Sequence, residues 1–166
     1  VSGPVGLPCP AGVERLSVTS ALEMHAAVFE RIAEQAVFIA VAAVADYRPS
    51  QPFESKIKKT TQTLAPTIEL VLNPDILGEV AALPQPPLCV GFAAESENLT
   101  AYAEEKRRRK RIPLIVGNLI ADGFGGDHNT LRLFDDDGEH LLPPDSKRRL
   151  ARQIVARIAT LLEKRR

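Results

Sequence analysis

Runs of apolar residues alternate with helical patterns along most of this chain. Residues 38–44, 88–92 and 112–116 are apolar runs typical of strands covered on both faces in a parallel sheet, and residues 67–72 alternate as a further strand. A helix over 20–33 follows a cap at Thr19 or Ser20, Asn73-Pro74-Asp75 opens a short helix, and a third helix covers 98–111. This alternation predicts a Rossmann-like α/β fold, in which a parallel sheet with helices on both faces makes three layers.

The C-terminal part has a different pattern. Residues 122–127 are a glycine-rich loop, and strands at 130–134 and 139–142 flank Asp135-Asp136-Asp137-Gly138, a strong hairpin signal. Ser146 is placed to cap a final helix whose leucine, isoleucine and valine residues fall on one face. We therefore expect a C-terminal hairpin and a packed helix after the sheet.

The composition fits one ordinary domain, with 166 residues of which 45% are apolar. Lys+Arg and Asp+Glu balance at 21 each, so no overall field draws the chain to nucleic acid or membrane, and an anion site must be local. Two cysteines and three histidines lack disulfide or metal-site spacing, which makes a reducing cytoplasm the expected compartment. Because residues 2–8 are turn formers that would follow a strand, we expect a single domain over 1–166, truncated on its N-terminal side.

The strongest candidate site begins where the first apolar run ends. Asp46, Tyr47 and Arg48 follow that run, and ligands of open α/β sheets bind at the carboxyl ends of the strands. Lys56 and Lys58 come shortly after and would share one face of an extended segment, an arrangement that suits a triphosphate. The alternative is a core strand followed by a solvated basic loop, with Asp46 in a surface salt bridge to Arg48 or a lysine.

A second basic segment covers residues 106–111, where all six side chains are Lys or Arg. Lys106 and Lys110 are four residues apart and would face the same phosphate chain from one side of a helix. The alternative is that these cations complement the helix dipole and solvate its surface. Asn73-Pro74-Asp75-Ile76 is either a helix start suited to anions and ribose hydroxyls or an ordinary cap.

Seven short motifs occur in order along the chain. They are SGPV at 2–5, TSALEM at 19–24, AAVADYRP at 42–49, KIKK at 56–59, NPDI at 73–76, VGFAAE at 90–95 and the basic helix closing at Lys110. Together they resemble bacterial phosphopantothenoylcysteine synthetase from the first residue to the last helix. AAVADYRP with KIKK is the most diagnostic pair.

The resemblance implies a ligase that activates the carboxylate of 4'-phosphopantothenate with CTP and joins it to cysteine, with Mg²⁺ at the phosphates. It also implies a homodimer and, in many bacteria, fusion to a flavin-dependent decarboxylase. Lys56 corresponds to the catalytic lysine of the family. The nucleotide-binding residues carried over by the resemblance are Ala40, Val41, Ala42, Asp46, Lys56, Pro74, Asp75, Ile76, Leu77, Phe92, Lys106 and Lys110.

One part of the family pattern has no counterpart in this sequence. The family's N-terminal strand and its asparagine-containing loop, which holds the acyl intermediate, are not found in residues 1–166. A rival hypothesis is therefore a non-catalytic nucleotide-binding or assembly domain that kept the fold; the retained KIKK motif opposes it. A second rival, an RNA-binding domain, rests only on residues 106–111 and predicts a steep salt dependence of RNA affinity.

Overall fold

The computed structural model describes residues 1–51, 55, 67–123 and 126–165. The chain divides into two compact units. We call Val1–Val28 with Ala42–Asp75 the ribbon unit, and Phe29–Val41 with Ile76–Arg166 the sheet unit. Lys56, Ile57, Lys58 and Lys59 of the KIKK motif and part of the glycine-rich loop, at 124–125, lie outside the described residues.

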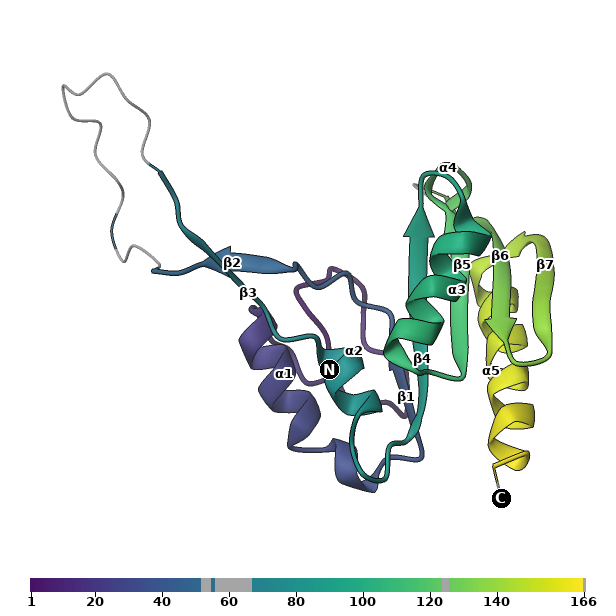
Figure 1. The fold of residues 1–166 in the computed structure, drawn as a ribbon, viewed down its shortest axis with the longest axis horizontal. Helices are drawn as coiled ribbons and strands as arrows, with labels where there is room; N and C mark the ends of the chain where they lie inside the picture. Colours follow the sequence, from purple (N-terminus) through teal and green to yellow (C-terminus); the bar gives the residue numbers. More distant parts are fainter. Residues whose placement is uncertain (52–54, 56–66, 124–125, 166) are drawn as a thin grey trace. The chain divides into compact units, whose positions relative to one another are not determined.

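The sheet unit is built on a five-stranded mixed sheet, which can be followed in Figure 1. Its strand order is β1-β4-β5-β6-β7; β1, β4 and β5 are parallel, and β6 and β7 are antiparallel to their neighbours. The strands are β1 (Val37–Ala40), β4 (Leu88–Glu95), β5 (Leu114–Leu119), β6 (His128–Asp135) and β7 (Gly138–Ser146). The predicted C-terminal hairpin is confirmed, and it extends the parallel strands into a mixed sheet.

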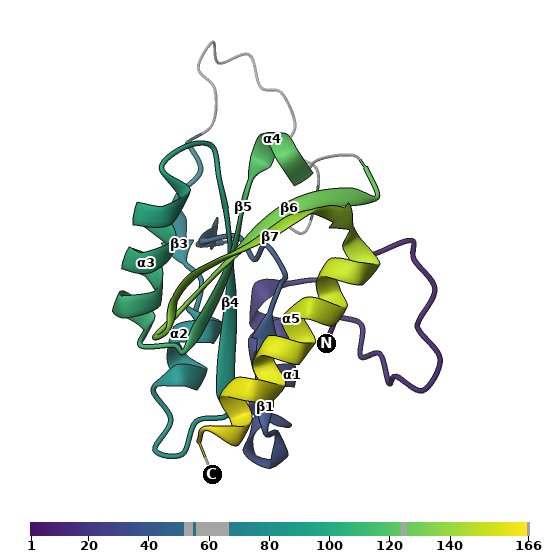
Figure 2. The same ribbon diagram turned by 90° about the vertical axis from the view of Figure 1, so that its right-hand side faces the viewer.

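Helices cover both faces of this sheet, as Figure 2 shows. Helices α2 (Ile76–Ala81) and α3 (Leu99–Lys110) pack on one face against β4 and β5, and α5 (Lys147–Glu163) packs on the other against β6 and β7. Two short elements, η1 (Ile32–Glu34) and α4 (Ile120–Gly123), complete the unit. The predicted Rossmann-like α/β architecture with three layers is therefore confirmed.

Side-chain alternation along the strands explains the two layers of core. Every second residue of β4, β5 and β6 joins Leu150, Ile154 and Ile158 of α5 in one apolar cluster. On the opposite face, glycines allow the helices to approach. A Cβ on Gly91 would lie 2.9 Å from Leu77, and one on Gly117 would lie 2.9 Å from Leu99, so larger residues there would push α2 and α3 off the sheet.

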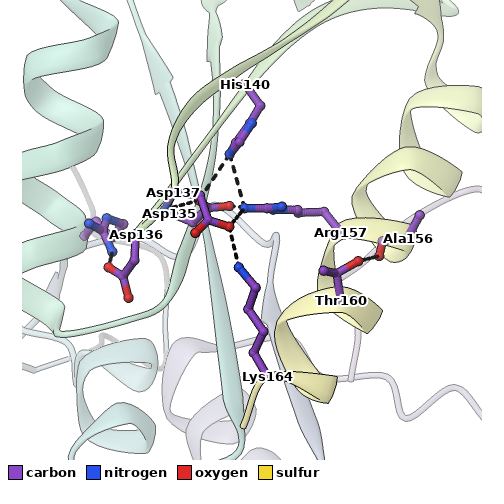
Figure 3. Close-up of polar contacts among 9 residues, drawn as sticks. Asp135, Asp136, Asp137, His140, Ala156, Arg157, Thr160 and Lys164 are labelled. Atoms are coloured by element: carbon purple, nitrogen blue, oxygen red, sulfur yellow. Dashed lines mark hydrogen bonds and ion pairs between the residues drawn. The ribbon is translucent and has the colours of Figure 1, made fainter.

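A buried carboxylate joins the β6–β7 turn to α5 (Figure 3). The Asp135 carboxylate accepts hydrogen bonds from Arg157 Nε at 2.7 Å and from the backbone N–H of Asp137 at 2.9 Å, and lies 3.2 Å from His140 Nε2. Burial alone would raise the pKa of Asp135, but these hydrogen bonds outweigh it and hold that pKa below its usual value. The network therefore depends on an ionised Asp135.

The ribbon unit contains helix α1 (Ala21–Phe29, whose last residue belongs to the sheet unit) and an antiparallel pair, β2 (Tyr47–Pro49) with β3 (Leu70–Leu72). A capping box starts α1, because Ser20 Oγ accepts from the Glu23 N–H at 3.2 Å while Glu23 Oε2 accepts from the Thr19 N–H at 2.7 Å. The hydrogen bonds that the Glu23 carboxylate accepts, above all the one from the Thr19 backbone N–H, hold the pKa of Glu23 below its usual value. The predicted cap is confirmed.

Several predicted boundaries were wrong. The run at 38–44 leaves the strand conformation after Ala40, and the helix expected over 20–33 ends at Phe29, with a short 3-10 turn at Ile32–Glu34. The alternating segment 67–72 forms only the short strand β3, which pairs with β2 and not with the parallel sheet. The Arg48 side chain in β2 donates hydrogen bonds to the Leu72 carbonyl in β3 and to Asn73 Oδ1, contacts that the alternation of side chains alone does not reveal. The loop at 122–127 begins within α4.

Candidate nucleotide site

Four predicted site residues of the sheet unit gather around one stretch of β4. Ala40 at the end of β1 pairs with Gly91, the residue before Phe92. Leu77 of α2 packs directly over Gly91. Lys106 of α3 donates a hydrogen bond from Nζ to the Phe92 carbonyl oxygen at 2.7 Å. The end of β1 and the start of α2 therefore adjoin Gly91, and a lysine of α3 binds the next residue, Phe92.

The other predicted residues of this unit adjoin the same stretch through the chain. Val41 follows Ala40 directly, and Lys110 lies one helical turn beyond Lys106 on the same face of α3. The Ile76 and Leu77 side chains are buried, so their backbone groups are what these residues can offer a ligand. Within the sheet unit, the positive charge of the predicted site therefore comes from the two lysines of α3.

In the ribbon unit, Asn73 ties together the two segments that carry the remaining predicted residues. Its backbone N–H donates to the Asp46 carbonyl at 2.8 Å, and its side-chain Nδ2 donates to the Ala45 carbonyl at 2.8 Å. Arg48 Nη1 donates to Asn73 Oδ1 at 3.2 Å and also to the Leu72 carbonyl. Ala45 and Asp46 are thus held next to Asn73, the residue before Pro74, by what we call the Asn73 clamp, formed by Asn73 and Arg48.

The alternative in which Asp46 pairs with Arg48 is not what the described residues show, because Arg48 is bound to Leu72 and Asn73. Sequence reasoning missed Asn73 as a positioning residue. Its only local signal is that an asparagine precedes the proline of a helix start, and its partners lie 25 and 28 residues away in the chain.

A pocket of about 390 Å³ lies within the ribbon unit beside this clamp. The short residues Ala42, Ala43 and Ala45 form part of its wall, together with Thr19, Ser20 and Arg48. Small side chains let a ligand approach the backbone closely, and Arg48 and the two hydroxyls add polar contacts at its wall. This volume falls within the usual range for small-molecule sites.

The cations in the basic run of α3 have different partners. Lys106 is bound to the Phe92 carbonyl, whereas Arg107 pairs with Asp136 of the β6–β7 turn at 2.7 Å. Helical geometry turns neighbouring cations to different sides. The predicted common face of Lys106 and Lys110 is consistent with the helix, and the ion pair of Arg107 compensates one of the cations on which the RNA hypothesis rests.

The described residues also bear on metal binding and membrane insertion. Among the described residues, no group of three or more His, Cys, Asp or Glu side chains is placed to hold a metal ion. The same part of the chain has no helix long and apolar enough to cross a membrane.

Cys89 in β4 is buried, and burial raises the pKa of its thiol to about 11.

The fold and the residues around Phe92 define a Rossmann-like α/β domain of the kind that binds ligands at an open sheet. The chain belongs to the family described as DNA/pantothenate metabolism flavoprotein C-terminal domain, which matches residues 1–162. The resemblance inferred from the motifs is thereby confirmed.

Three relatives illustrate the match. The coenzyme A biosynthesis bifunctional protein CoaBC of Vibrio cholerae serotype O1 is 47% identical over 159 residues, covering 93% of this chain and 40% of that protein. The protein of the same name from Escherichia coli K12 is 47% identical over 165 residues, covering 96% and 41%. The crystal structure of the C-terminal domain of CoaBC matches with a TM-score of 0.78 and 33% identity, covering 98% of this chain and 72% of that one. The chain thus spans about 40% of the length of these full-length relatives.

Proposed function

We propose that this chain is the ligase part of a coenzyme A biosynthesis enzyme, which joins 4'-phosphopantothenate and cysteine to give 4'-phosphopantothenoylcysteine. CTP is the co-substrate, and CMP and pyrophosphate are the other products. Family membership over residues 1–162 and the names of the relatives support the reaction class. The observation that carries the site is that Ala40 and Leu77 adjoin Gly91 while Lys106 binds the carbonyl of the next residue, Phe92.

The proposed reaction has two steps. A carboxylate oxygen of 4'-phosphopantothenate attacks the α-phosphorus of CTP, and the bond to the leaving pyrophosphate breaks. The cysteine amine then attacks the carbonyl carbon of the acyl-cytidylate, forming the amide, releasing CMP and losing a proton. The first step brings two anions together, so fixed cations must offset their repulsion and stabilise charge that develops at phosphorus.

Lys106 and Lys110 are the cations we assign to nucleotide phosphates. The hydrogen bond from Lys106 to the Phe92 carbonyl holds this ammonium group against β4. An ammonium group carries a full positive charge on a flexible stem, and it can donate hydrogen bonds to phosphate oxygens. Lys110, one turn along the helix, extends the same cationic face.

Asp46 and Lys56 take the other roles in this proposal. The Asn73 clamp holds the backbone of Asp46, which we assign to the ribose, beside Pro74. On the family resemblance we also assign to the nucleotide Ala42, Pro74 and Asp75 of the ribbon unit and Ile76 and Leu77 of the sheet unit. We assign Lys56 to the chemical step on the family motif alone. Mg²⁺ would enter with the phosphates, which commonly supply most of its ligands, and the exposed carboxylate of Asp46 is a hard oxygen donor that suits it.

The proposal extends to the setting of the enzyme. We expect residues 1–166 to act as one synthetase domain, as a homodimer and in the cytoplasm. The relatives are named bifunctional, which supports association with a second activity, the flavin-dependent decarboxylase expected from the sequence.

Calorimetric titration of this chain with CTP and ATP, each with Mg²⁺, tests the nucleotide assignment. We expect CTP to bind more tightly, because the backbone that follows β1 at Val41 and Ala42 can read a pyrimidine edge where a purine needs more room. A Lys106→Gln variant should weaken CTP binding, whereas Arg109→Gln, which is exposed on the same helix, should not. Tighter ATP binding would contradict the pyrimidine assignment.

The rival of a non-catalytic domain is distinguished by turnover. CTP binding without CTP-dependent pyrophosphate release in the gene product that contains this chain would favour a nucleotide-binding or assembly role. RNA binding that is steeply salt-dependent and lost with Arg107 and Arg108 would favour the RNA hypothesis.

A further inference from the structure

A pocket of the sheet unit lies at the amino end of the parallel strands, away from Phe92. Its volume is about 570 Å³, and its lining comes from the last turn of α3, the following residues Ile112 and Pro113, the β6–β7 turn and the end of α5. Ile112 and Pro113 precede β5, whereas ligands of open α/β sheets normally bind beyond the carboxyl ends of the strands. Lys106 and Lys110 are not part of this lining. The proposed nucleotide site therefore does not account for the pocket.

The lining is strongly cationic in a chain with zero net charge. Five basic side chains face two carboxylates, a local excess of three positive charges. Both carboxylates already have partners: Asp136 pairs with Arg107 at 2.7 Å, and Asp137 pairs with Lys164 at 2.6 Å (Figure 3). The uncompensated charge therefore belongs to the remaining three basic residues of the lining, Arg108, Arg111 and Arg165.

These three arginines are exposed, lie at or just beyond the ends of α3 and α5, and line the same pocket. No hydrogen bond or ion pair joins the Arg108, Arg111 or Arg165 side chain to another residue in the described part of the chain. A helix C-terminus favours cations on its own helix, but bringing like charges of two helices together is unfavourable until an anion neutralises them. The pocket thus has the charge that an anionic ligand requires.

The wall of the pocket suits a ligand that is more than a simple ion. Guanidinium groups bind phosphate oxygens with two parallel hydrogen bonds, which gives geometric selectivity for phosphates. Ile112, Pro113 and Leu161 add an apolar surface. The Arg107 Nε–H is buried and has no acceptor among the described residues, the kind of donor that a bound ligand or water satisfies.

We infer that this pocket is a second ligand site, in which Arg108, Arg111 and Arg165 bind the phosphates of a phosphorylated small molecule. The ion pairs of Arg107 and Lys164 with the β6–β7 turn hold its rim in place before the ligand arrives. The inference is independent of the ligase reaction, because it uses none of the residues assigned to that reaction.

Inorganic pyrophosphate is the probe for this site. Its binding is measured by titrating it into this chain and recording amide NMR spectra. We expect saturable shifts at the amides of Arg108, Arg111, Ile112 and Arg165, with a dissociation constant below about 1 mM. The double variant Arg108→Gln, Arg111→Gln should bind pyrophosphate at least about tenfold more weakly, as measured at the same amides. The reason is that loss of one charged contact to a phosphate lowers affinity by about tenfold. Arg109→Gln removes an exposed charge from the same helix outside the pocket and is the matched control; it should leave the affinity unchanged.

Three outcomes would overturn the inference. They are shifts that never saturate, equal weakening by the double variant and by Arg109→Gln, and saturable shifts confined to the amides around Phe92 and Lys106. The last outcome would place pyrophosphate only at the proposed active site and leave the ligase proposal standing. Conversely, failure of CTP to bind would leave the pocket result intact. The amide spectrum of each variant without probe reports whether it has folded.

Discussion

Replacing Asn73 by alanine would remove the clamp that holds the Asp46 segment beside Pro74. Two side-chain hydrogen bonds are lost, from Nδ2 to the Ala45 carbonyl at 2.8 Å and from Arg48 to Oδ1 at 3.2 Å. The backbone hydrogen bond from the Asn73 N–H to the Asp46 carbonyl remains. The segment should therefore loosen without detaching.

The size of the effect follows from these two bonds. A neutral hydrogen bond contributes about 0.5 to 1.5 kcal/mol and one to a charged group about 1.5 to 3 kcal/mol. Because the charged bond is long, we take the low end of its range, so the clamp is worth about 2 to 3 kcal/mol. Nucleotide binding must restore the order that the clamp supplied, so this sum is the upper limit of the loss. We expect CTP to bind about tenfold more weakly.

Calorimetric titration of CTP and steady-state kinetics of the gene product that contains this chain measure the effect. KM for CTP should rise more than kcat falls, since the clamp positions the nucleotide segment. Asn129→Ala is the matched control, because it removes a side-chain to backbone hydrogen bond of 2.8 Å in β6. Asn73→Asp, which keeps the acceptor for Arg48 but loses the donor to Ala45, should lie between wild type and Asn73→Ala. Unchanged CTP affinity in a folded Asn73→Ala variant would refute the positioning role.

Three further predictions concern other parts of the chain. Lys110→Gln should weaken CTP binding about tenfold, whereas Lys56→Gln should lower kcat far more than CTP affinity; kinetics showing the reverse would exchange their roles. Asp135→Asn should lower the free energy of unfolding by about 1.5 to 3 kcal/mol, because it removes the charge of the buried partner of Arg157, which keeps its ion pair with Asp137. Since the folded-state pKa of Asp135 is lowered, this difference should be fully present above pH about 4 and shrink as pH falls further; a pH-independent difference in denaturant titrations would contradict it. Cys89, with its buried thiol pKa raised to about 11, should react with alkylating reagents only on unfolding, as mass spectrometry of pulse-labelled protein can check.

Local patterns in the sequence predicted much of the fold. The Ser20 cap, the Asp-rich turn between β6 and β7 and the Ser146 cap of α5 all depend on residues within a few positions of each other. Such interactions form the same way in many folds, so short motifs identify them. The order of strands and helices then followed from the alternation of the patterns.

Contacts between residues far apart in the sequence were harder to predict. The alternation at 67–72 indicated a strand, but nothing in it shows that β3 pairs with β2, because strand propensity carries no information on the partner. The end of β1 at Ala40 lies inside an unbroken apolar run and has no local signal. The hydrogen bonds of Asn73 to Ala45 and of Lys106 to Phe92 join residues 28 and 14 positions apart, so only the folded chain reveals them. The basic pocket depends on two helix ends that meet only in the folded sheet unit.

The most direct test of the ligase proposal measures all products of one reaction. The gene product that contains this chain is incubated with Mg²⁺, 4'-phosphopantothenate, cysteine and either CTP or ATP, and the products are quantified by mass spectrometry and pyrophosphate release. We predict equal amounts of 4'-phosphopantothenoylcysteine, CMP and pyrophosphate with CTP, far less with ATP, and a large loss with Lys56→Gln. Pyrophosphate release that does not depend on 4'-phosphopantothenate, or CTP binding without any amide product, would contradict the proposal.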